Sequence, residues 1–436
     1  AAKKAIENRL SILSGGPGTG KTYTLASVVA LLAEMYADSH KPFHVLIGAP
    51  TGKAAVRMVE SIKDTKRRLK EDNDIDQNIL DAIPERATTI HRLLGAAYQS
   101  PYFRHDARKP LTADMVIIDE VSMVDLPLMA KLLDALPKNC SLMLVGDVNQ
   151  LASVEPGRVY GDVCQAASQE GPLCGCLTRL EKSRRFPATS AIGRISKLIN
   201  HGDPQAWNVL NEASGGNDLE VLSAQTLATG TQKLAALVEE HLSGFLAAKK
   251  PEAALGAATR FRILCALRKG PYGVKRMNRH IETILSKKGL NPKGRFYDHQ
   301  LIMINVNTPA LGLYNGDVGV VLTTEGTKVK DKDFTAWFYD KDQEPIPIPV
   351  NLLPRHETAF AMTVHKSQGS EFPYMAMILP PDAISPILTR ELLYTGITRV
   401  KIDTKKQTGK LTLWCSETSF MKALDTRTER MTGLFS

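Results

Sequence analysis

The sequence contains no long hydrophobic run and few cysteines. No apolar stretch in its 436 residues approaches the roughly 20 residues that a membrane-crossing helix needs, so we expect no contact with a membrane. The opening segment, Ala1–Arg9, has no apolar signal-peptide core, which favours a cytoplasmic protein. The six cysteines show no disulfide framework, and the close pair Cys174 and Cys176 is not accompanied by the further ligands of a zinc site. We therefore expect reduced thiols that act as small buried hydrophobic groups.

Length and charge set further limits. A chain of 436 residues exceeds what one hydrophobic core usually serves, so we expect at least two domains. Hydrophobic content of 43% and charged content of 23% are ordinary for a globular protein. The net charge of +9 fits a polyanionic partner, although many basic proteins bind no nucleic acid.

The segment from Ser14 to Thr22 matches the pattern G-x-x-x-x-G-K-[ST] between an apolar run, Leu10–Leu13, and a helical stretch, Leu25–Ala33. Glycines let successive N–H groups face one anion, and the helix N-terminus adds the positive end of its dipole. In such a loop the lysine contacts the β- and γ-phosphates and the threonine hydroxyl ligates Mg²⁺. We therefore predict a nucleoside triphosphate site that comprises Gly16, Pro17, Gly18, Thr19, Gly20, Lys21, Thr22 and Tyr23.

Two further strands end in residues suited to the same chemistry. The strand Met115–Ile118 runs into Asp119 and Glu120. Asp119 can hold Mg²⁺ through water, and Glu120 can accept the proton of the water that attacks the γ-phosphate; a solvated acidic pair is the alternative. The strand Ser141–Val145 is followed by Gln150, which suits either a γ-phosphate sensor or an ordinary polar loop.

A third strand end indicates a second polyanion. The strand His44–Ala49 is followed by Pro50, Thr51 and Lys53, and ligands of open α/β sheets lie beyond the carboxyl ends of strands. Because Lys21 already serves the nucleotide, this turn favours another phosphate-bearing partner. A plain strand-to-helix turn is the alternative.

The first 165 residues alternate strands with helices, which predicts one parallel, doubly wound α/β domain. Thr88–Leu94 begins a helix with a threonine cap, and His91 in it is by itself more typical of a structural histidine than of a functional one. The polar segment at 98–111 has the proline and basic content of an exposed loop or hairpin.

The later part of the chain predicts a second α/β unit. Arg184 and Arg185 are adjacent and suit phosphate recognition across a cleft. We expect helices over 187–255 and a strand at Phe261–Leu267 that opens the second unit. Short strands separated by Gly, Asn and Asp turns over 295–353 indicate a small inserted β-barrel.

The order of these segments is more specific than any one of them. The P-loop is followed by Ala-Pro-Thr-Gly-Lys-Ala-Ala, Thr-x-His-Arg-Leu-Leu, Asp-Glu-Val-Ser-Met, Gly-Asp-x-x-Gln-Leu, Thr-Val-His-Lys-Ser-Gln-Gly-Ser-Glu and Tyr-Thr-x-x-Thr-Arg. This order resembles superfamily 1 DNA helicases, and within them the RecD family, over nearly the whole chain. Further resemblance lies in Leu311–Gly319, Ala359–Phe372 and the tail Thr426–Arg430. The family implies an ATP-driven motor that moves 5′→3′ along single-stranded DNA in the repair and processing of DNA ends.

The resemblance implies an α/β fold with two RecA-like P-loop NTPase domains and ATP between them. The first domain would span 1–180, with a strand-separating hairpin at 98–111. The second would span 181–294 and 354–436, interrupted by an SH3-like β-barrel at 295–353. RecD proteins of the RecBCD complex also carry an N-terminal domain that docks on a RecC-like subunit. We expect that domain to be missing here, and RecB-like and RecC-like chains to be partners.

The resemblance also assigns residues to roles by motif position. Lys21, Thr22, Asp119 and Glu120 keep the roles given above, and Gln150 becomes the γ-phosphate sensor. The second domain would offer Arg185 and Arg399 to the γ-phosphate, where they stabilise transition-state charge and make domain closure depend on the nucleotide. The nucleotide side would also include Arg184, Gly369 and Glu371. The DNA track would include Pro50, Thr51, Lys53, His91, Thr363, His365 and Lys366.

The sequence departs from the family pattern in three places. Arg184 stands where an aromatic residue commonly stacks on adenine, although a guanidinium can stack on a base as well. The glutamine that reads adenine would fall just before Ala1, and the segment between Gln150 and Leu180 is short. Three alternatives stay open: a stand-alone helicase, an ATP-gated DNA clamp or assembly subunit without unwinding, and an RNA-directed motor.

Overall fold

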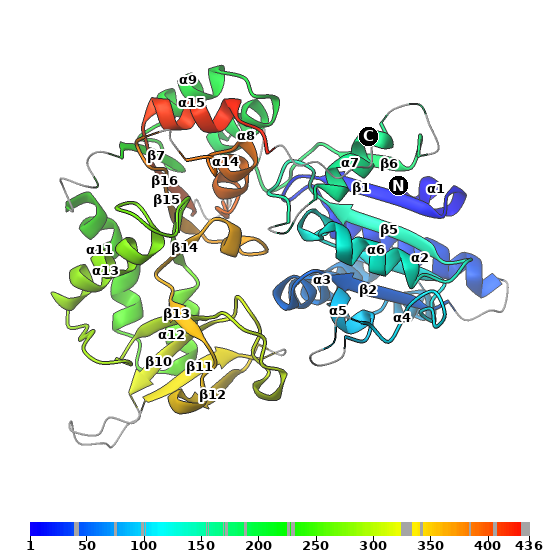
Figure 1. Cartoon of the computed structure of the whole chain (residues 1–436), viewed down its shortest axis with the longest axis horizontal. Helices are drawn as coiled ribbons and strands as arrows, with labels where there is room; N and C mark the ends of the chain where they lie inside the picture. Colours follow the sequence, from blue (N-terminus) through cyan, green and yellow to red (C-terminus); the bar gives the residue numbers. More distant parts are fainter. Residues whose placement is uncertain are drawn as a thin grey trace. The chain divides into compact units, whose positions relative to one another are not determined.

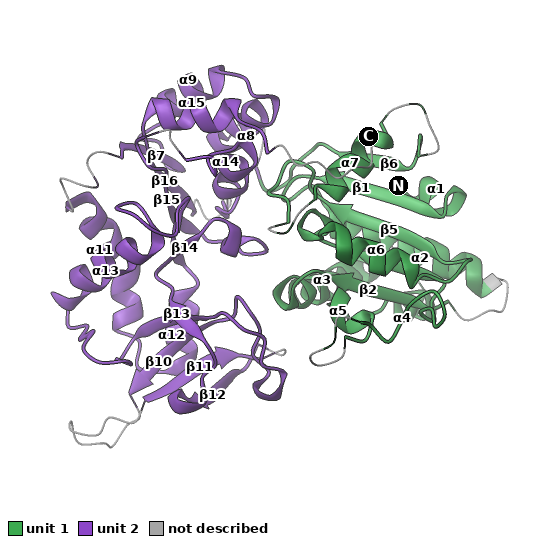
Figure 2. Cartoon of the chain, in the orientation of Figure 1, with its two compact units in different colours: residues 1–185, 429–436 green, residues 186–428 purple. Residues whose placement is uncertain are grey.

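A computed structural model gives the fold of the chain. It describes residues 1–38, 43–73, 76–96, 100, 102–153, 155, 157–168, 170, 173–186, 190–224, 227, 232–323, 334–340, 343–382, 385–403 and 408–428. The chain divides between Arg185 and Phe186 into two compact units (Figure 2). Each unit contains a parallel β-sheet flanked by helices, so the predicted α/β class is confirmed.

The first unit is built on a six-stranded parallel sheet in the order β3-β2-β4-β5-β1-β6. Figure 1 labels its strands β2, β5, β1 and β6. The four central strands, β2, β4, β5 and β1, are mostly apolar because helices cover both faces of the sheet. The strands are β1 (Leu10–Gly15), β2 (Val45–Ala49), β3 (Thr88–Thr89), β4 (Met115–Ile118), β5 (Ser141–Gly146) and β6 (Leu177–Leu180).

Helices fill two separate cores on the two faces of this sheet. Neighbouring residues of a strand point to opposite faces, so Val116 and Ile118 join one core and Met115 and Ile117 join the other. The first core contains residues of α5 (Ile90–Leu93), α6 (Leu126–Asp134) and α7 (Val159–Ala166). The second contains residues of α1 (Ala2–Glu7), α2 (Lys21–Asp38), α3 (Gly52–Asn73) and α4 (Gln77–Ala82).

The second unit contains a five-stranded parallel sheet in the order β14-β8-β15-β16-β7. Its strands are β7 (Leu219–Ser223), β8 (Phe261–Cys265), β14 (Ala361–Thr363), β15 (Tyr374–Ile378) and β16 (Lys410–Cys415). Its helices include α8 (Ala191–His201), α9 (Gln205–Glu212), α11 (Gln232–Leu246), α12 (Pro251–Ala258), α13 (Val274–Ser286), α14 (Arg390–Ile397) and α15 (Glu417–Asp425). The region 187–255 is therefore not wholly helical, because β7 pairs with β16.

A five-stranded antiparallel sheet is inserted between α13 and β14, in the order β12-β11-β10-β9-β13. It has its own core, which includes Ile302, Val321 and Phe338. Its strands are β9 (Gln300–Ile304), β10 (Val318–Thr323), β11 (Phe334–Tyr339), β12 (Pro345–Pro349) and β13 (His356–Thr358). The insertion thus extends beyond the predicted end at 353, and an SH3-like barrel stays a prediction.

The proline-rich strand β12 is possible because it lies at the edge of this sheet. Pro345, Pro347 and Pro349 alternate with Ile346 and Ile348, and Ile348 is buried in the core. Proline has no N–H to donate to a ladder, so alternate prolines are tolerated where one side of a strand has no partner.

The prediction of reduced, buried cysteines holds for five of the six. All six cysteines are free thiols, but Cys174 is exposed whereas the other five are buried. In the predicted hairpin, isolated antiparallel bridges join Ala96 to Phe103 and Asp106 to Lys109, while residues 98, 99 and 101 lie outside the described residues. Within the described ranges, no helix has both the length and the apolar character that crossing a bilayer requires.

Candidate nucleotide and nucleic-acid site

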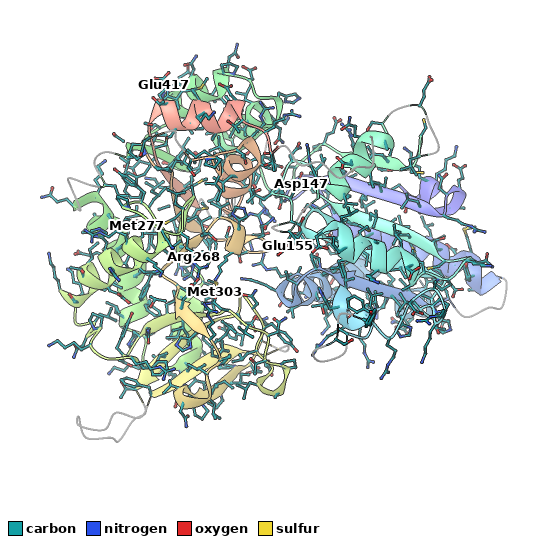
Figure 3. The ribbon with its side chains drawn as sticks, viewed as in Figure 1. Asp147, Glu155, Arg268, Met277, Met303 and Glu417 are labelled. Carbon is teal, nitrogen blue, oxygen red and sulfur yellow. The ribbon has the colours of Figure 1, made fainter. Side chains whose placement is uncertain are left out.

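The residues predicted for chemistry in the first unit follow the strands of one sheet. Because all six strands are parallel, their carboxyl ends lie at the same edge. Figure 3 labels Asp147, which follows β5, at this edge. The predicted residues follow β1 (16–23), β2 (50–53), β4 (119 and 120), β5 (150) and β6 (184 and 185), and His91 lies in the helix after β3.

The strand order separates these residues into two groups. Strands β4, β5, β1 and β6 carry the predicted nucleotide residues, whereas β2 and β3 carry Thr51, Lys53 and His91. Strands β1 and β2 are three strand spacings apart, which is about 14 Å. The two phosphate-seeking turns are therefore too far apart to serve one phosphate group.

The P-loop joins β1 directly to α2. Gly18 and Gly20 have φ angles of +73° and +88°, which only glycine adopts without strain. The Thr19 hydroxyl donates to the Gly16 carbonyl (2.8 Å). The Lys21 ammonium donates to the carbonyls of Gly15 (2.8 Å) and Gly16 (3.2 Å), so this charge lies against the loop. Thr22 and Tyr23 form the first turn of α2, where Tyr23 is exposed.

The acidic pair Asp119 and Glu120 turns sharply at the end of β4. The Asp119 N–H donates to the Gly48 carbonyl (2.9 Å), and the Glu120 N–H donates to Asp119 Oδ1 (2.8 Å). Burial raises the pKa of Asp119, the Glu120 carboxylate raises it further, and Lys21 opposes the shift. Glu120 has φ +51° and ψ +39°, a left-handed conformation that is strained for any residue except glycine. Such strain is typical of functional positions.

Gln150 is buried and held by a carboxylate that the sequence analysis did not single out. Its Nε2 donates to Asp147 Oδ2 (3.1 Å), and Asp147 Oδ1 accepts from the Asn149 N–H (3.0 Å). A carboxylate only accepts, so the amide oxygen of Gln150 must point away from Asp147. This Oε1 atom has no partner among the described residues, and neither does the buried Ser122 Oγ.

Tyr160 of α7 contacts the end of β1, the strand that leads into the P-loop. Its hydroxyl donates to the Leu13 carbonyl of β1 (3.1 Å), and its ring packs against Gly146 at the end of β5. Burial raises the pKa of Tyr160 well above its ordinary value, so the phenol stays protonated. Its position 147 residues from Leu13 in the chain left no signal in the sequence.

The segment after β6 lies on the P-loop. The Ser183 hydroxyl donates to the Pro17 carbonyl (2.9 Å), and the Arg184 N–H donates to the Gly18 carbonyl (2.8 Å). A Cβ atom on Gly18 would lie 2.4 Å from Arg185 Cβ, so this close approach requires glycine. Arg185 belongs to the first unit and directly precedes the second, whereas the resemblance assigned it to the second domain.

The residues of the first unit that are predicted to contact a second polyanion lie at the starts of helices. The Thr51 hydroxyl caps α3 by accepting from the Ala54 N–H (3.2 Å), and Lys53 lies in the first turn of that helix. His91 is exposed on α5, and its ring is 5.9 Å from that of Phe103. Pro50 connects β2 to this cap.

In the second unit, two groups of predicted residues lie on neighbouring segments. Thr363 ends β14, and its hydroxyl accepts from the Lys366 N–H (3.3 Å); His365 lies between them. Gly369 has φ +68° and turns the chain toward Glu371. The next residue, Phe372, donates its N–H to the Arg399 carbonyl (3.0 Å). Arg399 is buried and donates from Nε to the Thr395 carbonyl (3.1 Å).

The protein offers few side-chain ligands for a metal ion near the P-loop. Among the described residues there is no cluster of three or more His, Cys, Asp or Glu side chains that could hold a metal ion. The Thr22 hydroxyl and the Asp119 carboxylate are hard oxygen donors of the kind that Mg²⁺ uses when phosphates and water supply its other ligands. The residues present therefore fit a magnesium ion that arrives with a nucleotide.

The chain matches two family models and several curated proteins. Residues 1–156 match the family described as AAA domain, and residues 358–402 match the UvrD-like helicase C-terminal domain. The whole chain is 34% identical to the RecBCD enzyme subunit RecD of Haemophilus influenzae and 36% identical to that of Mycolicibacterium smegmatis, of which it covers 71% and 73%. It is 30% identical, over 93% of its length, to the ATP-dependent RecD2 DNA helicase of Deinococcus radiodurans, of which it covers 48%.

A solved structure shows a similar but more distant chain. The crystal structure of Bacteroides Pif1 bound to ssDNA matches 96% of this chain and 93% of that one, with a TM-score of 0.49 and 15% identity.

Proposed function

The chain belongs to the RecD family, as its motif order predicts, and we propose that it is an ATP-driven helicase that moves 5′→3′ along single-stranded DNA. One observation carries this proposal most directly. The P-loop, the strained acidic pair, the buried Gln150 and the Arg184–Arg185 segment follow four neighbouring strands and lie at one edge of one sheet. That edge can bind a triphosphate and activate water beside it.

In this proposal the first unit performs four tasks in ATP hydrolysis. Lys21, released from the loop carbonyls, neutralises the β- and γ-phosphates, and the loop N–H groups hold them. Thr22 and Asp119 would hold a magnesium ion, which supplies further positive charge to the phosphates. Glu120 accepts the proton of the attacking water. Gln150 would sense the γ-phosphate by turning its amide N–H from Asp147, to which it donates, toward a phosphate oxygen.

Arginines couple the nucleotide to movement in this proposal. Arg185 lies where the chain passes from the first unit to the second, and Arg399 lies in the second unit beside the Gly369–Glu371 turn. Guanidinium groups that reach a γ-phosphate stabilise charge in the transition state. Their release after hydrolysis would let the DNA contacts of the two units shift by one step.

The proposed DNA track uses the residues at the other end of the first sheet and the turn after β14. Pro50, Thr51, Lys53 and His91 would contact the strand from the first unit, and Thr363, His365 and Lys366 from the second. Phosphate contacts would dominate the affinity, so binding should weaken steeply with salt and show little preference for sequence.

Finer features belong to the same proposal. The antiparallel sheet at Gln300–Thr358 would be the SH3-like domain of the family, and the segment at 98–111 would be the pin that separates strands. RecB-like and RecC-like chains would be partners, in a cytoplasmic complex that processes DNA ends. Size-exclusion chromatography with and without such chains distinguishes a subunit from a stand-alone helicase.

Strand displacement on tailed duplexes tests the function. We expect unwinding of a duplex with a 5′ tail and none of a duplex with a 3′ tail, with ATP hydrolysis stimulated by DNA. Glu120→Gln should bind ATP and lose turnover, and undiminished hydrolysis in this variant would refute the assigned base. Stimulated hydrolysis with no unwinding of either duplex would favour an ATP-gated clamp. Stronger stimulation by RNA than by DNA would favour an RNA-directed motor.

A further inference from the structure

A cavity in the second unit is lined by three cationic side chains and two amides, and of these residues only Lys366 has a role above. It has a volume of about 240 Å³. It lies where the carboxyl ends of β8 and β14 meet the antiparallel sheet, in the region of Arg268 and Met303 in Figure 3. The lining residues are Arg268, Asn305, Asn315, Arg355 and Lys366, which we call the basic cavity.

Hydrogen bonds hold this lining in place. The Asn305 N–H donates to the Arg355 carbonyl (2.8 Å), and Lys366 Nζ donates to Asn305 Oδ1 (2.6 Å). Lysine only donates, so the amide oxygen of Asn305 faces Lys366 and its Nδ2 hydrogens point elsewhere. The Gly316 N–H donates to the Ile304 carbonyl (2.9 Å), which fixes the turn that carries Asn315. These bonds fix the positions of the polar residues that line the cavity.

The charge of the cavity selects the class of ligand. Glu357 Oε1 accepts from Lys366 (2.7 Å), and Glu357 Oε2 lies 3.3 Å from Arg268. No carboxylate of the described residues lies within ion-pair distance of the Arg355 guanidinium, so three cations face one anion. This excess attracts an anion, while the Glu357 carboxylate opposes a doubly charged one. A singly charged phosphodiester fits better than free phosphate.

The side chains that line the basic cavity favour the phosphate backbone of a nucleic acid over its bases. Base-stacking sites use aromatic side chains, and the basic cavity has none. Guanidinium, ammonium and amide N–H groups are instead the donors that contact the phosphate backbone. Lys366 connects the cavity to Thr363 through the hydrogen bond of its N–H, so the cavity continues the proposed track.

We propose that the basic cavity binds one phosphodiester of single-stranded DNA, with Arg355 as its main cationic contact. The proposal rests on the proposed function, because it needs a single strand to lie along the second unit. It adds a contact from the inserted antiparallel sheet to those of the parallel sheet. One phosphate would thereby be gripped by both sheets of the unit.

The test is the salt dependence of binding to a fluorescent oligothymidylate, measured by anisotropy. The slope of log K against log salt is negative. Removing one cation that neutralises a phosphate of a single strand reduces the magnitude of this slope by about 0.7. We expect Arg355→Gln to reduce the magnitude of the slope by about this amount, and Arg355→Lys to have the slope of the wild type. Asn315→Ala should weaken binding without changing the slope, because it removes a neutral donor. Arg279→Gln, which removes an exposed charge from α13 outside the cavity, is the matched control and should bind like the wild type.

The outcomes separate this proposal from the proposed function. If the wild type binds the oligomer and hydrolyses ATP in response, but Arg355→Gln and Arg279→Gln have the same slope as the wild type, the basic cavity is not a DNA site. If the wild type neither binds the strand nor responds to it, both proposals fail. We also expect inorganic phosphate to compete no better than chloride at equal ionic strength. Selective competition that Arg355→Gln abolishes would identify a free phosphate site instead.

Discussion

The left-handed backbone at Glu120 leads to a prediction in which stability and activity move in opposite directions. Glu120 has φ +51°, at the point where β4 turns into the following 3₁₀ turn. An L-residue in this conformation costs about 1–2 kcal/mol, and glycine costs about 0.5–1 kcal/mol more backbone entropy than alanine. The difference favours glycine at this position by about 0–1.5 kcal/mol, with a midpoint of about 0.75 kcal/mol.

The comparison uses Glu120→Ala and Glu120→Gly, since both remove the carboxylate and differ only in Cβ. We expect the glycine variant to have the higher free energy of unfolding, and both variants to lose ATP turnover. Lys131, which is exposed within α6, is the matched control: at this position we expect the alanine variant to be the more stable one. There Lys131→Gly should be less stable than Lys131→Ala by about 1 kcal/mol, the helix penalty of glycine.

Urea unfolding at equilibrium, without nucleotide, measures these differences. If the glycine variant at position 120 is less stable than the alanine variant, as at Lys131, the strained turn does not exist. If either Glu120 variant retains turnover, the carboxylate is not the base. The two readouts are independent, so the backbone and the chemistry are tested separately.

Three further predictions concern the supports of the site and of the inserted sheet. Gly18→Ala should impair ATP binding much more than Gly20→Ala, because a Cβ on Gly18 meets the segment after β6 at 2.4 Å and a Cβ on Gly20 meets nothing within 4 Å; equal binding of a fluorescent ATP analogue would contradict this. Tyr160→Phe should lower the free energy of unfolding by about 1–3 kcal/mol, because it leaves a buried carbonyl of β1 without this donor; an unchanged urea midpoint would exclude the contact. Burial opposes protonation of His299, but Asp298 raises the pKa of His299, so its stabilising contribution is present below its ordinary pKa and is lost as pH rises through the raised value. The stability difference between wild type and His299→Asn should therefore shrink between pH 6 and pH 8.5 in urea unfolding, and a difference independent of pH would refute the pair.

Four strands of the first sheet (β1, β2, β4 and β5) could be predicted because their residues are mostly apolar, whereas the Thr-Thr strand β3 and the polar strand β6 could not. Met115–Ile118 is predicted and observed with the same bounds. Parallel pairing then brings the residues after each strand to one edge, so much of the candidate site follows from sequence. The resemblance to a family could be recognised for the same reason, since its motifs are these strand ends.

Other elements could not be predicted because their cause is not local. β7 is a five-residue stretch that is a strand only because it pairs with β16. β12 consists of alternating prolines and isoleucines, a composition that argues against a strand except at an edge. Its position at the edge is set by the order of the other strands, which sequence patterns do not contain.

The same limit applies to residues of the candidate sites that no local pattern in the sequence marks. Asp147 orients Gln150, and Tyr160 holds the end of β1, but each role depends on a contact in the folded chain. Arg355 and Asn315 are ordinary polar residues of an inserted sheet until the fold brings them beside Lys366. A close pair of charges in the sequence, such as Asp119 and Glu120, is visible, whereas a cluster formed by five separate segments is not.

The central claim is that ATP hydrolysis on the first unit drives movement toward the 3′ end of a DNA strand. Displacement of streptavidin from a biotinylated oligonucleotide tests this movement without any duplex. We expect ATP-dependent displacement from the 3′ end, none from the 5′ end, and none by Glu120→Gln. Displacement from the 5′ end, or equal displacement with and without ATP, would contradict it.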